Sequence, residues 1–251
     1  MSRNICLHIS YDGTRYLGWQ KLGTPGSSQY NKTIQGKLES LLEKMTGEVI
    51  ELHGSGRTDA GVHAADQTAN FHTECTMTET EMLAYINRYL PDDIAVNSLH
   101  EAAPRFHARL NAKAKTYCYT VRNSTVPDVF RHRYEYTVSA PLDIAAMRSA
   151  AGLLCGTHDF RNFCSSKRTK KSTVRTLYSI NFEQHGPLLC IYFRGNGFLY
   201  NMVRILTGTL LEIGTGQRAI DTLPILFDAE KRTPAGYTAP PHGLMLMNVE
   251  Y

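Results

Sequence analysis

The sequence predicts an α+β fold made of two halves. Two kinds of segment occur throughout the 251 residues. Some alternate apolar and polar residues, as strands do, and others have the 3.6-residue period of amphipathic helices. They do not follow the regular strand-then-helix repeat of a doubly wound sheet, which favours α+β over α/β. A chain of this length can form one large domain or two smaller ones. We expect one half at residues 1–104 and the other at 105–251.

The first half begins with a strand and a helix. Apolar and polar residues alternate over 5–11, which predicts a strand that ends near Tyr11. Thr33 is placed to cap a helix, because its hydroxyl can accept from an amide of the first turn, and Gly47 is placed to end it. A strand over 49–52 is expected to lead into a glycine-rich loop.

A second helix and two strands follow. Thr78 and Glu81 have the spacing of a capping box, and Pro91 ends the helix behind them. Runs near 94–101 and 115–123 have the residue pattern of strands.

The second half repeats this mixture of elements. Asp143 can cap a helix, and the runs 173–184 and 188–194 predict two strands joined by a turn. A further helix is expected to open at Asn196, and a last strand is expected near 244–250.

Composition and motifs exclude several classes of protein. The first residues lack the apolar region of a signal peptide and no apolar stretch is long enough to span a membrane, so we expect a cytoplasmic protein. Six scattered cysteines form no Cys-x-x-Cys pair and ten histidines show no ligand spacing, so we expect no metal. Neither a Walker loop nor a dinucleotide-binding glycine motif is present, so no nucleotide cofactor is expected.

Positive charge is unevenly distributed, although the net charge is only +4. Residues 102–127 contain no Asp or Glu, and a single acid lies between 160 and 211. Two basic windows in a nearly neutral protein are typical of a one-sided positive surface for nucleic acid; a solvated basic face is the alternative. Within the second window, 165–172 is expected to be a mobile basic loop, and it contains Lys170 and Lys171.

A glycine-rich loop at 54–64 holds a single acid, Asp59, with no second carboxylate within six residues on either side. Glycines let a backbone adopt positive φ and approach a ligand closely. Such a loop can hold one carboxylate at a fixed place and leave room for a large, flat ligand. A tight turn before a strand is the alternative, because Gly-Ser-Gly clusters are usually turns.

The whole string 54–64 resembles the signature loop of the tRNA pseudouridine synthase A family, in which Ala usually stands at the place of Ser55. In that family the aspartate is the catalytic nucleophile, which implies this role for Asp59. The resemblance covers nearly the whole chain, with further matching motifs in order at 11–14, 18–20, 33–35, 106–109, 113–119, 156–160, 197–204 and 240–244.

Tyr117 and Arg204 lie in two of these motifs. The run 113–119 resembles the family's Lys-x-Tyr-x-Tyr strand, whose first tyrosine stacks on the target uracil, which implies this role for Tyr117; by pattern alone a strand tyrosine is a core residue. The run 197–204 resembles a Phe-Leu-x-x-Met-Val-Arg motif whose arginine pairs with the catalytic aspartate, which implies this role for Arg204. By pattern alone Arg204 is an arginine that reaches water, and the two middle residues of the motif differ from those common in the family.

Other residues are expected to contact RNA. The resemblance of 240–244 to the family's Pro-x-Gly-Leu segment implies that Leu244 lines the uracil pocket. Arg57 can fill the place of an extruded base or hold the backbone. The predicted site comprises catalytic Asp59, Tyr117 and Arg204, and substrate-binding Arg57, Thr58, Arg109, Tyr117, Lys170, Lys171 and Leu244.

The resemblance also implies an architecture and an activity. The family has two α+β halves whose antiparallel sheets join across a central basic cleft, with helices packed on one side, and its members are homodimers. They convert uridine to pseudouridine at positions 38, 39 and 40 of the tRNA anticodon stem-loop, without a cofactor because nothing is oxidised and no group is added. The alternatives are a noncatalytic module that binds structured RNA, a paralogue that modifies other tRNA uridines, and a hydrolase that uses Asp59 on a small substrate.

Overall fold

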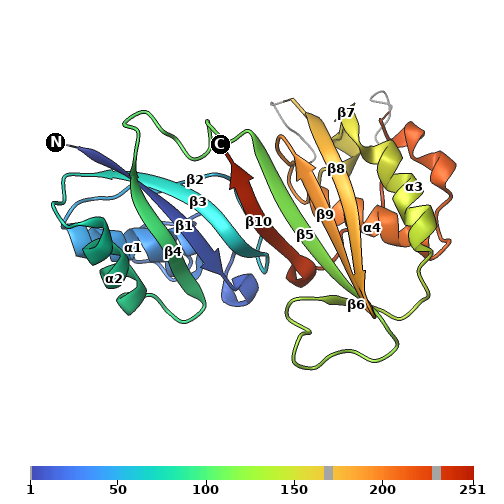
Figure 1. Cartoon of the computed structure of the whole chain (residues 1–251), viewed down its shortest axis with the longest axis horizontal. Coiled ribbons are helices and arrows are strands. Elements are labelled where there is room, and N and C mark those ends of the chain that lie inside the picture. Colours follow the sequence, from blue (N-terminus) through green and yellow to red (C-terminus); the bar gives the residue numbers. More distant parts are fainter. Residues whose placement is uncertain (1, 167–171, 228–232) are drawn as a thin grey trace. The chain divides into compact units, whose positions relative to one another are not determined.

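A computed structural model describes residues 2–166, 172–227 and 233–251. Within these ranges the chain forms two compact units, Met1–Lys113 with Met245–Tyr251, and Ala114–Leu244 (Figure 1). These units differ from the predicted halves at 105–113 and at the C-terminus. The difference at the C-terminus arises because the last strand pairs with a strand of the first unit, which no local pattern in the sequence indicates.

The first unit is a mixed sheet with two helices. Its strands run in the order β4-β1-β3-β10, and the short β2 also pairs with β3. The pairs of β1 with β3 and with β4 are antiparallel, whereas β10 runs parallel to β3. The elements are β1 (Arg3–Tyr11), α1 (Ile34–Thr46), β2 (His53–Gly54), β3 (His63–Thr73), α2 (Glu79–Tyr89), β4 (Ile94–Ala102) and β10 (Leu244–Glu250).

Both predicted caps of the first unit are confirmed. The Thr33 hydroxyl accepts from the Gly36 amide at the start of α1, and Gly47 ends that helix at a φ of 74°. At the start of α2, Thr78 and Glu81 accept from each other's backbone amides, which completes the capping box. Each cap satisfies amides that the helix itself leaves without a partner, so these helix starts follow from local chemistry.

The region around the glycine-rich loop differs from its prediction. Residues 49–52 form no strand, and the pairing begins only at His53. The long strand β3 was not predicted. Polar side chains at Gln67, Thr68 and Asn70 are buried in it, because neighbouring groups hydrogen-bond two of them, so the strand lacks a simple apolar–polar alternation.

The second unit contains an antiparallel ladder in the order β5-β9-β8-β7, with β6 parallel to β5. Helix α3 packs on α4 and on β8, and α4 also contacts β5. The α+β class is therefore confirmed. The elements are β5 (Ala114–Asn123), β6 (Tyr136–Val138), α3 (Ile144–Leu154), β7 (Gly156–Asp159), β8 (Val174–His185), β9 (Leu188–Gly195) and α4 (Met202–Gly214).

Helix α4 begins later than predicted. The expected start at Asn196 is wrong, because the residue before the first helical turn, Asn201, has a left-handed φ of 60°. The segment 196–201 is therefore a connection, and Arg204 lies in the first turn of the helix.

Short 3₁₀ turns join several elements, at Gly13–Arg15, Tyr30–Lys32, Arg161–Phe163, Ile220–Thr222, Pro224–Phe227 and Pro241–Gly243. Across the part of the chain that the structure describes, no helix has both the length and the apolar character needed to cross a bilayer.

Candidate active site

The Asp59 loop connects β2 to β3 in the first unit. Arg57 is exposed, Thr58 is buried and Asp59 is half-buried. Gly61 has a φ of 78°, and the Val62 amide donates to the Asp59 carbonyl at 3.1 Å, which closes a turn directly after the aspartate. The loop thus presents one arginine to solvent and holds the aspartate at its turn.

A segment near the N-terminus fixes the backbone of this loop. The Trp19 amide donates to the Thr58 carbonyl at 3.0 Å, and the Gly61 amide donates to the Tyr16 carbonyl at 3.3 Å. The Tyr11 and Thr58 hydroxyls share a buried hydrogen bond of 2.8 Å. Thr58, predicted as a substrate contact, is thus tied to the protein interior through its side chain.

Two glycines allow the segment and the loop to approach closely. A Cβ at Gly54 would lie 2.5 Å from ring atoms of Trp19, well inside van der Waals contact. Gly18 has a φ of +100° and lies so close to the loop that a Cβ would stand 2.6 Å from the Thr58 carbonyl oxygen. Any larger residue at either place would push the loop away from its support.

Side chains of β3 support the loop from its other side. The Ser55 hydroxyl donates to Gln67 Oε1 at 2.5 Å, and Gln67 Nε2 donates to the Gly56 carbonyl at 2.9 Å. The Gly13 amide donates to His63 Nδ1 at 3.1 Å. Sequence analysis assigned no role to Gln67 or His63, because only the fold shows that Gln67 bonds to the loop and that His63, within the loop string itself, bonds to Gly13.

Arg109 is exposed in a turn that is anchored to the same sheet. The Asn70 amide oxygen accepts from the Ala108 amide at 2.8 Å, and the Tyr251 hydroxyl donates to the Ala108 carbonyl at 2.7 Å. The neighbouring His107 stacks on His53, the residue that begins β2, with ring centroids 4.8 Å apart. Burial, followed by the nearby His53, lowers the pKa of His107.

Tyr117 lies on β5 in the second unit. Its side chain is 7% exposed, and its ring meets that of Phe198 edge to face, with centroids 5.2 Å apart. Phe198 belongs to the connection that precedes α4, so this contact joins two of the motifs that the sequence singled out. The edge-to-face contact fixes the orientation of the Tyr117 ring, and the hydroxyl at the end of the ring remains a polar group that can form hydrogen bonds.

Arg204 is anchored by two hydrogen bonds at the start of α4. Its Nε donates to the Ala239 carbonyl at 2.7 Å, and its Nη1 donates to Asn201 Oδ1 at 2.8 Å. The Ala239 amide returns a bond to the Arg204 carbonyl at 3.1 Å. The guanidinium is therefore held in place and half-buried, and it does not extend freely into water.

The segment 239–244 links Arg204 to the strand of Tyr117. Tyr119, two residues after Tyr117 on the same strand, donates its hydroxyl to the Pro240 carbonyl at 2.9 Å. A Cβ at Gly243 would lie 2.7 Å from the Tyr119 ring, so the chain passes directly over it. Leu244, 4% exposed, follows at the first position of β10.

The predicted residues thus fall into two groups. Arg57, Thr58 and Asp59 share one loop of the first unit, and Arg109 lies in the same unit. Tyr117, Arg204 and Leu244 belong to the second unit and are connected through 239–244. Lys170 and Lys171 lie outside the described residues.

Comparison with known proteins identifies the family. The family model described as tRNA pseudouridine synthase matches residues 8–111 and 150–251. The tRNA pseudouridine synthase A of Geobacillus sp. (strain WCH70) is 48% identical over 252 residues, covering 100% of this chain and 99% of that protein. The tRNA pseudouridine synthase A 2 of Bacillus anthracis is 42% identical over 248 residues, covering 99% of each chain.

Among solved structures, the archaeal box H/ACA sRNP Nop10–Cbf5 complex is similar over 83% of this chain and 44% of that chain, with 12% identity and a TM-score of 0.34. A likeness at this level carries no argument about the chain. The family match does carry one, because it includes the Asp59 loop and the Arg204 helix, and the matches to the two full-length relatives span the Tyr117 strand as well. The chain therefore belongs to the tRNA pseudouridine synthase family, and it is an isomerase that converts uridine to pseudouridine.

Proposed function

We propose that the chain modifies uridines 38, 39 and 40 of the tRNA anticodon stem-loop, with Asp59 as the nucleophile. The observation that carries the proposal is the Asp59 loop, which holds a single half-buried acid and whose backbone is bonded to Trp19 at Thr58 and to Tyr16 at Gly61. Relatives that match the full length of the chain bear the name tRNA pseudouridine synthase A, which supports the same substrate class.

The reaction needs few groups. The bond between the ribose and N1 of uracil breaks, the base turns, a bond from the same ribose carbon to C5 forms, and the C5 proton moves to solvent while N1 gains one. An ionised carboxylate can assist by attack on the sugar or on the base, or by starting an elimination. Atoms and electrons balance without an oxidant or a donor, so we propose that no cofactor takes part.

Tyr117, Arg204 and Leu244 complete the proposed site. The Tyr117 ring stacks on uracil, and its hydroxyl takes part in proton transfer. Arg204 supplies the positive charge that keeps Asp59 ionised. Two hydrogen bonds hold the guanidinium at one place, and the same 239–244 segment that accepts one of them carries Leu244, which lines the uracil pocket.

The RNA is held by shape and charge. A uridine within a stem must be extruded before the enzyme can reach it, and the deep major groove of RNA keeps side chains from reading the bases. Exposed Arg57 and Arg109 on the first unit fit contacts to the backbone, and Lys170 and Lys171 extend the basic window of the second. We further propose that the enzyme is a homodimer and acts in the cytoplasm.

Mapping pseudouridine in tRNA tests the proposal. Cells that lack this protein should lose the modification at positions 38–40 and regain it with the wild-type gene but not with Asp59→Asn. Loss at other positions instead would favour a paralogous specificity. That second candidate is supported by relatives with numbered names, such as the tRNA pseudouridine synthase A 1 of Clostridium tetani (strain Massachusetts / E88), which is 44% identical over 249 residues, covering 99% of this chain and 100% of that protein.

A further inference from the structure

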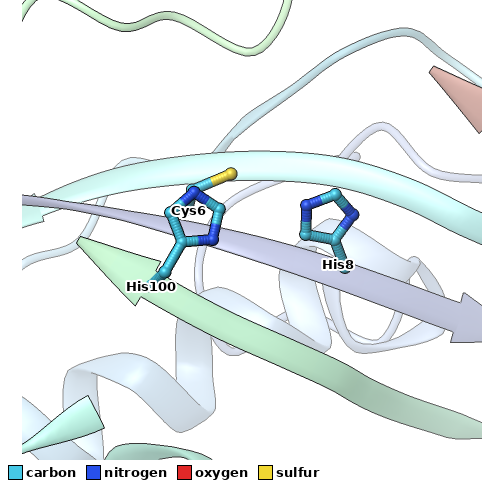
Figure 2. A group of neighbouring side chains, drawn as sticks. All are labelled: Cys6, His8 and His100. Atoms are coloured by element: carbon cyan, nitrogen blue, oxygen red, sulfur yellow. The ribbon is translucent and has the colours of Figure 1, made fainter. Parts of the chain in front are cut away.

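Three side chains of the first unit form a group that could hold a metal ion. Cys6 and His8 come from β1 and His100 comes from β4, as Figure 2 shows. The sulfur and one ring nitrogen of each histidine all lie within 4.8 Å of one another. None of these residues belongs to the proposed catalytic or RNA-binding set.

The sheet itself fixes the positions of these side chains. Cys6 and His8 are two residues apart on one strand, so both side chains point to the same face. His100 lies directly opposite Cys6 in the antiparallel ladder of β1 with β4. The rings of His8 and His100 are nearly parallel, with an interplanar angle of 27° and centroids 6.0 Å apart. The backbone ladder therefore holds the three groups together before any ion arrives.

Asp66 orients one of the histidines. His8 Nδ1 lies 2.8 Å from Asp66 Oδ1, on the neighbouring strand β3. This contact leaves Nε2 of the same ring available as a ligand atom. A carboxylate that accepts from the second nitrogen of a metal-binding histidine is the usual partner in such sites, because it fixes the ring orientation and makes the ligand more basic.

Burial gives the group a closed side and an open side. Cys6 is 2% exposed, His8 is half-buried and His100 is exposed. An ion could enter past the exposed His100 and reach the buried sulfur, and a sulfur ligand favours cations with a strong affinity for thiolate.

We propose that Cys6, His8 and His100 form a binding site for a zinc-class divalent cation, with water as a fourth ligand. One sulfur and two imidazole nitrogens are a ligand set that Zn²⁺ prefers. Zinc–ligand bonds of about 2.0–2.3 Å in a tetrahedron place ligand atoms roughly 3.3–3.8 Å apart. The present ligand atoms, all within 4.8 Å of one another, would have to draw together to this spacing when the ion binds. A bound ion would tie β1 to β4.

Cobalt titration tests the site, because Co²⁺ replaces Zn²⁺ and reports its ligands by colour. Purified protein treated with a chelator should bind about one Co²⁺, with the visible bands of a tetrahedral ion and a near-ultraviolet thiolate-to-cobalt band, and Zn²⁺ should abolish both signals. Zn²⁺ should also raise the melting temperature, since binding to the folded state alone stabilises it.

Variants separate this site from adventitious binding. Cys6→Ser should remove the thiolate band. Asp66→Asn, which alters the partner of a ligand, should weaken Co²⁺ binding about 10–100-fold. His100→Gln, which removes a ligand, should weaken Co²⁺ binding more than that. Cys75→Ser, which alters another cysteine of the same unit, is the matched control and should bind as wild type. The proposal would be overturned if the wild type showed no thiolate band, or if His100→Gln bound Co²⁺ with unchanged affinity. Because His100 is exposed, weaker binding in His100→Gln would not be due to a folding defect. Isomerisation should be unchanged in His100→Gln.

Discussion

Asp59 is the residue on which the proposed chemistry depends, and its neighbours are bonded to the protein while Arg57 faces solvent. Asp59→Asn should abolish isomerisation but leave tRNA affinity within a few-fold, because phosphate contacts supply most of the affinity for nucleic acid. Tritium release from tRNA labelled at uridine C5 measures the rate, and filter binding measures the affinity.

Asp92→Asn is the matched control for this change. Asp92 is an exposed aspartate of the same unit, and its loss should leave both quantities unchanged. Turnover retained in Asp59→Asn would mean that the carboxylate is not the nucleophile, and the role of the loop would have to be sought in binding.

Arg204 supports the structure as well as the proposed reaction. Arg204→Ala removes the donor to the Ala239 carbonyl, whose residue is 0% exposed, and leaving a buried acceptor without a partner costs roughly 1–3 kcal/mol. Urea unfolding should show this loss of stability, and single-turnover rates at saturating tRNA should fall sharply.

The comparison for Arg204 is Arg218, which follows α4 and donates from Nε to Glu212 of that helix at 2.7 Å, with both side chains half-buried. Arg218→Ala leaves Glu212 with the Tyr237 amide as a donor, and it should leave the single-turnover rate alone whatever its effect on stability. If the two variants behaved alike in rate, Arg204 would have only a structural role.

At the scale of elements, the glycine-rich loop depends on close contact with the Trp19 segment. Gly54→Ala would place a methyl group 2.5 Å from the Trp19 ring. Overpacking of this kind costs roughly 1–3 kcal/mol, and it should also displace Asp59 and lower the rate at saturating tRNA. Calorimetric melting and single-turnover kinetics measure the two effects.

Gly152→Ala is the matched control for Gly54→Ala. Gly152 lies within α3, and a Cβ there would meet no atom within 4 Å. Alanine favours a helix over glycine, so this variant should gain about 0.5–1 kcal/mol and keep its activity. A Gly54→Ala protein as stable and active as the wild type would show that the loop is not held in the observed position.

The β5–β9 ladder places two cysteines, Cys118 and Cys190, on one face. Cys190 lies opposite Thr120, two residues along from Cys118. The Cys118 thiol donates to the Cys190 sulfur, which lowers the pKa of Cys190 and raises that of Cys118. At neutral pH Cys190 should therefore carry more thiolate than an ordinary cysteine.

Alkylation by iodoacetamide, followed by mass spectrometry at several pH values, tests this order. Cys190 should react first. Its alkylation rate should reach a plateau at a lower pH than that of Cys155, because burial raises the pKa of Cys155. Cys118→Ala removes the donor and should move the Cys190 profile to higher pH. A Cys190 profile unaffected by that change would exclude the shared hydrogen bond.

At the scale of the whole molecule, exposed basic residues should set the salt dependence of tRNA binding. The double variant Arg57→Gln, Arg109→Gln should weaken binding and reduce the slope of log K against log salt by about 0.7–0.9 for each phosphate that is no longer neutralised. Filter binding across a salt series measures the slope. Lys44 is an exposed lysine of α1 outside both basic windows, so Lys44→Gln should leave the slope unchanged. Equal slopes for the wild type, the double variant and Lys44→Gln would mean that the RNA does not contact Arg57 and Arg109.

The sequence by itself determined the elements whose signals are local. A cap needs only a hydroxyl or carboxylate within three residues of an amide, so Thr33, Thr78 and Asp143 marked the starts of α1, α2 and α3. The alternation of apolar and polar residues is also a local signal, and it located β1, β4, β5, β8 and β9. The Asp59 loop and the Arg204 helix were recognisable because a family signature is also a contiguous string.

Only the tertiary structure decided the features that join distant residues. Polar side chains of β3 are buried because they hydrogen-bond to other segments, and the start of α4 depends on the left-handed backbone of Asn201. The bond from Arg204 to Ala239 spans 35 residues, and the register that sets His100 opposite Cys6 joins strands far apart in sequence. Ligand spacing along the chain predicted no metal, since hydrogen bonds between strands, and not nearness in sequence, bring His100 to Cys6 and His8.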